Sequence, residues 1–149
     1  MAAERLRLFV ALDLPVGVRA ALAGWALTAV ADPPAPARLR PLPAESLHVT
    51  LCFLGGCDAA DVDDIAGACS CAVAGRSPAI ETALAEPVWL PPRRPRVLAV
   101  ALADVAGGLA ALQGRLADAL TAGGWYRREA RPYLPHVTVA RCRDLRRPA

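Results

Sequence analysis

Residues 47–56 read LHVTLCFLGG, and residues 134–142 read LPHVTVARC. The two histidines of the chain, His48 and His136, each begin a His-Val-Thr tripeptide inside an apolar, β-branched stretch. Such stretches are typical of strands, in which alternate side chains point to the same side. Each tripeptide therefore predicts an imidazole beside a hydroxyl on one face of a strand, His48 with Thr50 and His136 with Thr138. The central valine of each faces the core.

The two tripeptides are 88 positions apart, and each follows a segment that contains a predicted helix. This repetition predicts two related halves, packed about a pseudo-twofold axis that brings both tripeptides into one cleft. A single His-Val-Thr also occurs in ordinary strands, where the histidine is hydrogen-bonded and has no catalytic role. Because the repeat uses the whole histidine content of the chain, it favours a shared site.

Strand and helix patterns alternate along the chain, which predicts the α+β class. Apolar and β-branched runs predict strands at residues 6–12, 38–42, 47–54, 80–90, 96–102 and 135–140. Apolar residues at helical spacing predict helices from near Pro15 to about Val30, from an N-cap at Asp58 to Val73, and over residues 109–120 with an end at Gly123-Gly124. DPPAPA at residues 32–37 predicts a loop, and Gly55-Gly56 predicts the end of a strand.

A chain of 149 residues that is 55% hydrophobic has material for one well-buried core. We therefore expect residues 1–149 to form a single domain of two lobes, with one His-x-Thr motif in each. The first residues do not resemble a signal peptide, and the apolar run that follows breaks at Asp13 and Pro15 before it could span a bilayer. We expect a cytoplasmic protein with no membrane partner.

Arginine supplies all 17 basic residues, and the formal net charge is +3. The arginines cluster at Arg93, Arg94 and Arg96, at Arg127, Arg128 and Arg131, and at Arg141, Arg143, Arg146 and Arg147. Arginine holds phosphate with a planar, always-charged fork. A solvated basic surface is the alternative interpretation of these clusters.

The five cysteines form no Cys-x-x-Cys pair, and neither histidine stands at a zinc-ligand spacing from them. We expect reduced, mostly buried cysteines and no metal site. Strict strand alternation would place Cys52 on the same face as His48 and Thr50, near whatever those residues do.

Two His-x-Thr pairs that face each other would supply the groups needed for phosphodiester hydrolysis. Histidine gives or takes a proton near neutrality, with a usual pKa of about 6.5. Threonine adds a short donor that holds an anionic oxygen. A base, an acid and two hydroxyl donors around one phosphorus atom predict in-line chemistry without a metal or other cofactor.

Paired His-x-Thr strands resemble the signature of the 2H phosphoesterases. RLFVALDLP at residues 7–15, LHVTLCFLGG at 47–56 and RPYLPHVTVAR at 131–141 are similar to the branch of RNA 2′,3′-cyclic phosphodiesterases, first described as 2′-5′ RNA ligases. This resemblance implies a bilobal α+β duplication whose central cleft binds an RNA end. It implies that His48 and His136 are the catalytic pair, with His48 preferred as acid, and that Thr50 and Thr138 bind phosphate oxygens.

Two further site residues come from the resemblance. Arg141 matches the family's arginine after the second motif, although strict alternation would turn it away from His136 unless a bulge or the strand's end intervenes. Phe9 lies on the opening strand, where relatives carry an aromatic residue that stacks on a base. Relatives also continue past the second motif with further strands, so C-terminal strands are expected to be missing here, and a neighbouring chain could cover the sheet edge.

The resemblance implies hydrolysis of 2′,3′-cyclic phosphate ends of RNA to 2′-phosphates, with 2′-5′ ligation as the possible reverse reaction. Two alternatives stay open. One is a phosphodiesterase for a small cyclic nucleotide or metabolite, and the other is a non-catalytic RNA-binding relative. The sequence does not determine the oligomeric state.

Overall fold

The computed structural model describes residues 3–31, 39–75 and 79–142. The loop predicted at 32–37 and five arginines lie outside these ranges: Arg38, Arg76, Arg143, Arg146 and Arg147. The chain divides into two compact units. Unit 1 comprises Met1–Leu12, Thr50–Ala83 and Ala103–Pro135, and unit 2 comprises Asp13–Val49, Leu84–Leu102 and His136–Ala149.

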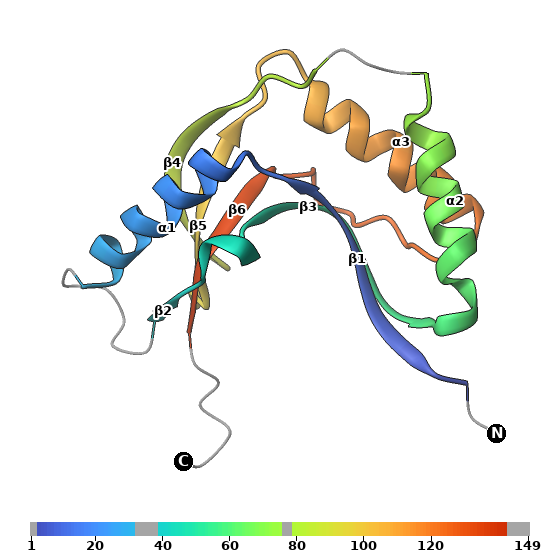
Figure 1. The fold of residues 1–149 in the computed structure, drawn as a ribbon, viewed down its shortest axis with the longest axis horizontal. Coiled ribbons are helices and arrows are strands. Elements are labelled where there is room, and N and C mark those ends of the chain that lie inside the picture. The colour runs from blue at the N-terminus through green and yellow to red at the C-terminus, as the bar shows by residue number, and fades with distance from the viewer. Residues whose placement is uncertain (1–2, 32–38, 76–78, 143–149) are drawn as a thin grey trace. The chain divides into compact units, whose positions relative to one another are not determined.

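Unit 2 is a sheet with one helix on it. Its elements are α1 (Val16–Ala31), β2 (Leu39–Pro41), the 3-10 turn η1 (Ala44–Ser46), β4 (Ala83–Leu90), β5 (Val97–Ala103), β6 (His136–Cys142) and the first two residues of β3 (His48–Asp58). Strand β6 is central, because β5 pairs with one side of it, while β2 and the start of β3 pair with it on the other, all antiparallel. Helix α1 packs against β2, β6 and η1 (Figure 1).

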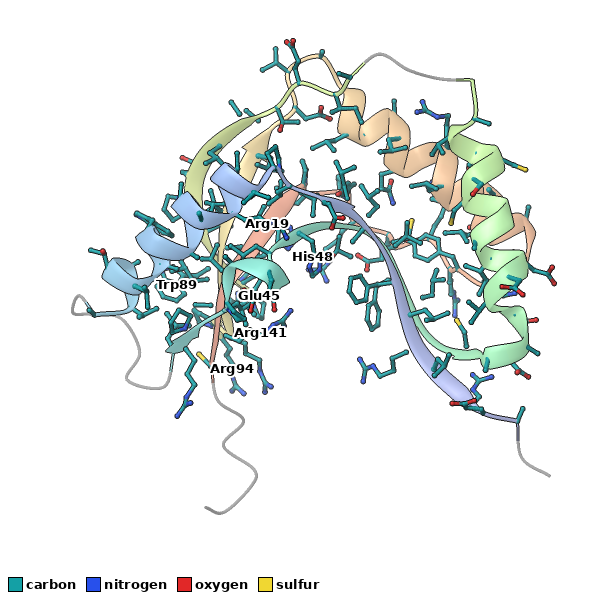
Figure 2. The ribbon with its side chains drawn as sticks, viewed as in Figure 1. Arg19, Glu45, His48, Trp89, Arg94 and Arg141 are labelled. Carbon is teal, nitrogen blue, oxygen red and sulfur yellow. The ribbon has the colours of Figure 1, made fainter. Side chains whose placement is uncertain are left out.

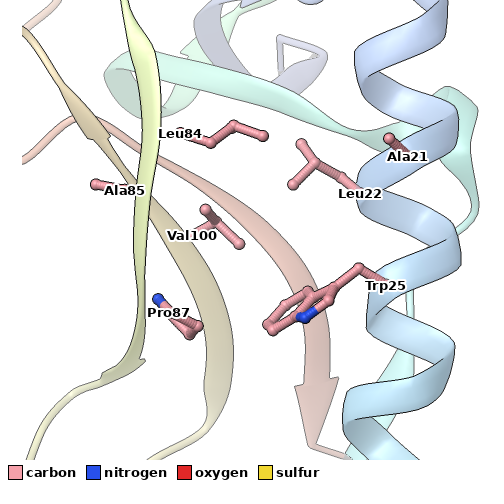
Figure 3. Close-up of a pocket in the computed structure, with 7 residues that line it drawn as sticks. All are labelled: Ala21, Leu22, Trp25, Leu84, Ala85, Pro87 and Val100. Atoms are coloured by element: carbon pink, nitrogen blue, oxygen red, sulfur yellow. The ribbon is translucent and has the colours of Figure 1, made fainter.

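The sheet of unit 2 buries the face that carries the valines of the two motifs. Val137 of β6 lies between Val49 of β3 and Val100 of β5, and all three side chains are buried. Val100 also lines an apolar cavity of about 330 Å³ beneath α1 (Figure 3). The lining residues are Ala21, Leu22, Trp25, Leu84, Ala85, Pro87 and Val100. The helix therefore covers the valine face, and the histidines of the motifs lie on the other.

Unit 1 combines two strands with two helices. Strand β1 (Arg5–Asp13) is the neighbour of β3, and helices α2 (Val62–Val73) and α3 (Gly108–Ala122) pack side by side (Figure 1). The apolar face predicted for residues 109–120 is buried, with its four leucines at 8% exposure or less. Helix α3 ends as predicted at the glycine pair, where Gly124 has φ 83° and the N–H of Trp125 donates to the carbonyl of Leu120.

Aspartates open both helices of unit 1. Asp58 accepts a hydrogen bond from the N–H of Ala60 and so begins the 3-10 turn η2 (Ala59–Asp61), which leads into α2. The predicted cap thus stands one short turn before the α-helix. The two carboxylate oxygens of Asp104 accept the N–H groups of Leu109 and Ala110, each at 2.9 Å, which satisfies two donors of the first turn of α3.

The predicted α+β class is confirmed, and each predicted strand and helix is present within a few residues of its expected bounds. One boundary was wrong. Strand β3 does not end at Gly55-Gly56 but continues to Asp58. Gly55 adopts φ 73°, a conformation that costs glycine little, so the chain changes direction inside the strand, and Arg5 donates to the carbonyl of Gly56.

The boundary between the units runs through the first motif. His48 and Val49 belong to unit 2, Thr50 belongs to unit 1, and the second motif lies in unit 2. One motif in each lobe therefore stays a prediction. Within the described ranges, no helix combines the length and apolar character needed to cross a membrane.

Candidate active site

Strand pairing brings the two motifs together. Val49 of β3 lies opposite Val137 of β6 in an antiparallel ladder, so His48 lies opposite Thr138. Thr138 shares its face of β6 with His136, two positions away. Diagonal neighbours of this kind have Cα atoms about 7–8 Å apart. His48, Thr138 and His136 thus occupy one face of the sheet, opposite the buried valines.

The turn before β3 orients His48. Its Nδ1 lies 2.8 Å from the backbone carbonyl oxygen of Ser46, the last residue of η1. A carbonyl only accepts hydrogen bonds, so Nδ1 carries the proton of the neutral ring, and Nε2 is its unprotonated nitrogen. The ring is only partly exposed, and its orientation is set before any substrate arrives.

Strand β6 contains a bulge of the kind that would turn Arg141 toward the face of His136. Leu98 of β5 pairs with Ala140, but the next residue, Ala99, pairs with Thr138, so Val139 is an extra residue in β6. Val139 and Ala140 are consecutive buried residues, and Arg141 after them is exposed. Because a bulge reverses the alternation, Arg141 lies on the same face as His136 and Thr138.

Strand β3 repeats the burial pattern of β6 residue by residue, from His48 onward. Leu51 and Cys52 are both buried, and Phe53, the fifth residue after His48, is exposed where β6 has Arg141. The expectation that Cys52 shares the face of His48 and Thr50 was therefore wrong. Its thiol lies near Cys69 of α2 and Gln113 of α3, and burial raises its pKa to about 11.

Tyr133 supports the first motif from within unit 1. Its phenol donates a 2.8 Å hydrogen bond to the backbone carbonyl of Thr50. Burial raises the pKa of this phenol, so it stays a neutral donor at physiological pH. Tyr133 was part of the quoted stretch at residues 131–141, but spacing alone did not suggest this role, because its partner is a backbone atom 83 positions away.

The two phenylalanines of unit 1 lie at its surface. Phe9 is 49% and Phe53 50% exposed. The guanidinium of Arg7 lies 5.5 Å from the centre of the Phe53 ring, a cation–π geometry. Phe9 is two residues from Arg7 along β1, on the same exposed side of that strand. Its exposure permits the predicted stacking on a base, which stays a prediction.

The arginine clusters differ in their surroundings. Arg128 forms an ion pair with Asp118 on α3, so this member of the second cluster is already neutralised. Arg93, Arg94 and Arg96 are exposed in the turn between β4 and β5. Figure 2 shows Arg94 and Arg141 at the same end of β6, with Glu45 of η1 and His48 further along.

Two other places are poor candidates for this chemistry. The cavity under α1 is lined by apolar side chains on the far face of the sheet, and none of the seven titrates. Across the portions of the chain described above, no three His, Cys, Asp or Glu side chains stand close enough to share a metal ion. Chemistry without a metal stays a prediction.

Comparison with known proteins identifies the relatives of this chain. A model of the 2′-5′ RNA ligase superfamily matches residues 20–148. The RNA 2′,3′-cyclic phosphodiesterase of Escherichia coli strain K12 is 32% identical over 141 residues, which are 93% of this chain and 73% of that protein.

Solved structures agree with this relationship. The crystal structure of TT0787 of Thermus thermophilus matches with a TM-score of 0.74 and 26% identity, over 97% of this chain and 76% of that one. The crystal structure of E. coli LigT complexed with 3′-AMP matches with a TM-score of 0.73 and 28% identity, over 98% of this chain and 79% of that one.

Proposed function

Because the chain belongs to the 2′-5′ RNA ligase superfamily, whose 2H phosphoesterase signature it carries, we propose that it hydrolyses 2′,3′-cyclic phosphate ends of RNA to 2′-phosphates. The single observation that carries the proposal is the register of β3 and β6. It sets His48 opposite Thr138 and diagonal to His136 on one face. Two imidazoles at that separation suit an acid and a base on opposite sides of one phosphorus atom.

The reaction needs two proton transfers. One histidine, His136 in our assignment, takes a proton from water as the water oxygen bonds to phosphorus. The bond between phosphorus and the 3′ oxygen breaks, and His48 donates a proton to that oxygen. The product carries a 2′-phosphate and a free 3′-hydroxyl, and proton exchange with solvent restores both rings.

The remaining groups stabilise the charge that develops on phosphorus. We assign the hydroxyls of Thr50 and Thr138 to the non-bridging oxygens, and the guanidinium of Arg141 to the same phosphate, as donors that are in place before the reaction. The bulge at Val139 supports the assignment of Arg141, because without it the side chain would face the core. Phe9 is proposed to stack on the terminal base.

The same arrangement would carry out 2′-5′ ligation if the 5′-hydroxyl of a second RNA replaced the attacking water. We include this activity in the proposal as the reverse of the cleavage of a 2′-5′ linkage in which the neighbouring 3′-hydroxyl attacks phosphorus, the 5′ oxygen leaves and the 2′,3′-cyclic phosphate forms. We also propose that the protein is located in the cytoplasm.

The test is incubation of the protein with 2′,3′-cyclic AMP in EDTA, followed by separation of 2′-AMP from 3′-AMP. We expect 2′-AMP at the same rate with and without EDTA. Formation of 3′-AMP, or loss of activity that added Mg²⁺ restores, contradicts the mechanism. The non-catalytic alternative predicts a different result. The wild-type protein would then be inactive, and the double variant His48→Ala, His136→Ala would bind an RNA end as tightly as the wild type does.

A further inference from the structure

Three elements of unit 2 bring arginines to one end of the motif strand β6. Arg40 of β2 lies directly opposite Arg141 of β6 in the antiparallel ladder. The turn between β4 and β5 reaches the same end, because the N–H of Cys142 donates to the carbonyl of Arg96 at 2.7 Å. That turn carries Arg94, which Figure 2 shows at this end of the sheet. We call Arg40, Arg94 and Arg141 the basic ridge.

The ridge is electrostatically unfavourable by itself. Like charges directly opposite each other on neighbouring strands destabilise a sheet. All three side chains are exposed, and no ion pair of theirs with a carboxylate is found in the ranges that the structure covers. Glu45 is the acidic residue nearest in sequence to His48, on η1, and it too lacks an ion pair there. An anion is the kind of ligand that would relieve the repulsion.

The ridge continues the face that carries the histidines. Along β6 this face presents His136, then Thr138 opposite His48, and then, past the bulge, Arg141 opposite Arg40. Successive residues on one face are about 7 Å apart along a strand. The ridge therefore begins about 7 Å beyond the level of His48, a distance comparable with the separation of consecutive phosphates in an extended RNA strand.

We propose that Arg40 and Arg94 of the basic ridge bind the phosphates on the 5′ side of the reacting phosphate, beyond the one that Arg141 holds, and that these contacts make an RNA oligonucleotide a better substrate than a cyclic mononucleotide. A 2′,3′-cyclic phosphate stands at the 3′ end of RNA, so every other phosphate of the strand lies 5′ to it. A strand whose cyclic phosphate is held between the histidines has its next phosphates at the level of Arg40 and Arg94. Positively charged grooves that track a backbone are the common means of holding single strands without reading sequence.

The inference rests on the proposed function, and its test separates the two. The kinetics of the wild-type protein are compared on 2′,3′-cyclic AMP and on a four-nucleotide RNA with a 2′,3′-cyclic end, over a range of salt. The test variant carries Arg40→Ala and Arg94→Ala. The matched control carries Arg127→Ala and Arg131→Ala, which removes the same charge from exposed positions of unit 1.

We expect the test variant to raise KM for the oligonucleotide about five- to tenfold, with kcat and the cyclic AMP reaction unchanged. The slope of log kcat/KM against log salt should fall by about 1.4, since single strands give about 0.7 for each phosphate contact. The control should keep wild-type values. Glu45→Gln should act in the opposite direction and lower the oligonucleotide KM, which loss of folding would not do.

Equal KM values for the oligonucleotide in the test variant and the wild type would refute phosphate binding by the ridge, and they would leave the proposed phosphodiesterase activity untouched. Equal rises in the test and control variants would also overturn it, because they would mean that only total charge matters. If the wild type hydrolyses the cyclic phosphate of neither 2′,3′-cyclic AMP nor the oligonucleotide, the proposed function itself is contradicted. In that case, fluorescence anisotropy with a 2′-phosphorylated oligonucleotide still tests the ridge, which predicts weaker binding by the test variant.

Discussion

The hydrogen bond from Tyr133 to the backbone of Thr50 offers the sharpest single-atom test of the site. Replacement of Tyr133 by phenylalanine removes the phenolic oxygen and keeps the ring. The lost bond is 2.8 Å long and partly buried. Its net value is about 1 kcal/mol, and the carbonyl left without this donor brings the cost to about 1–2 kcal/mol. For a chain of this length we expect a fall in Tm of about 3–6 °C.

The functional effect should exceed the loss of stability. Thr50 stands next to the ladder that aligns the two histidines, so a looser backbone at Thr50 should misplace its hydroxyl, the proposed donor to phosphate in the transition state. We expect kcat for 2′,3′-cyclic AMP to fall about tenfold, with little change in KM. Tyr126→Phe is the matched control, since the structure gives Tyr126 no side-chain hydrogen bond among the residues it describes.

A double-mutant cycle tests whether Tyr133 acts through Thr50. Thr50→Val removes the hydroxyl and keeps the β-branched shape. In that background, Tyr133→Phe should lower kcat much less than it does in the wild type, because the group that it positions is gone. Equal falls in Tm and kcat for Tyr133→Phe and Tyr126→Phe, or additive effects in the cycle, would refute this positioning role.

Three further predictions concern other groups. His48→Ala and His136→Ala should each lower kcat about 10²- to 10⁴-fold without changing the circular dichroism spectrum, and a fall below tenfold in either would remove that residue from the acid–base pair. Because burial raises the pKa of Cys52 to about 11, the unfolded chain releases this proton first as pH rises. The free energy of unfolding should thus drop by about 2 kcal/mol between pH 9 and pH 11, and a parallel drop in Cys52→Ala contradicts this. Asp104→Ala should lower the free energy of unfolding by about 1–2 kcal/mol, because it removes two capping hydrogen bonds of α3. Urea unfolding should show a lower midpoint with the same slope, and an unchanged midpoint would contradict a stabilising role of this cap.

Much of the fold followed from local patterns. The leucines at helical spacing predicted the buried face of α3, and the glycine pair predicted its end, because both depend on neighbours a few residues away. The His-Val-Thr tripeptides likewise predicted strands with the valine buried and the other two side chains on the opposite side. Burial of Val49 and Val137 agrees with that expectation.

Strict alternation failed where strands are irregular. It placed Cys52 beside the histidines and turned Arg141 away from them, and the structure has the reverse in both cases. One extra residue in β6, Val139, accounts for Arg141, since it lets two consecutive side chains enter the core. Nothing local distinguishes a bulged Val-Ala pair from a regular one, because the bulge depends on how the residue fits against β5.

The sequence by itself determined the pattern from which the chemistry is proposed: two histidines, each with a threonine two positions later, in strands of an α+β chain. It could not determine which atoms meet, because pairing partners 88 positions apart are selected by packing of the whole sheet. Only the tertiary structure decided that His48 faces Thr138, that Tyr133 holds the backbone of Thr50, and that Arg40 and Arg141 stand side by side. Each of these depends on strand register, which sets side-chain neighbours across the sheet and leaves no trace in local spacing.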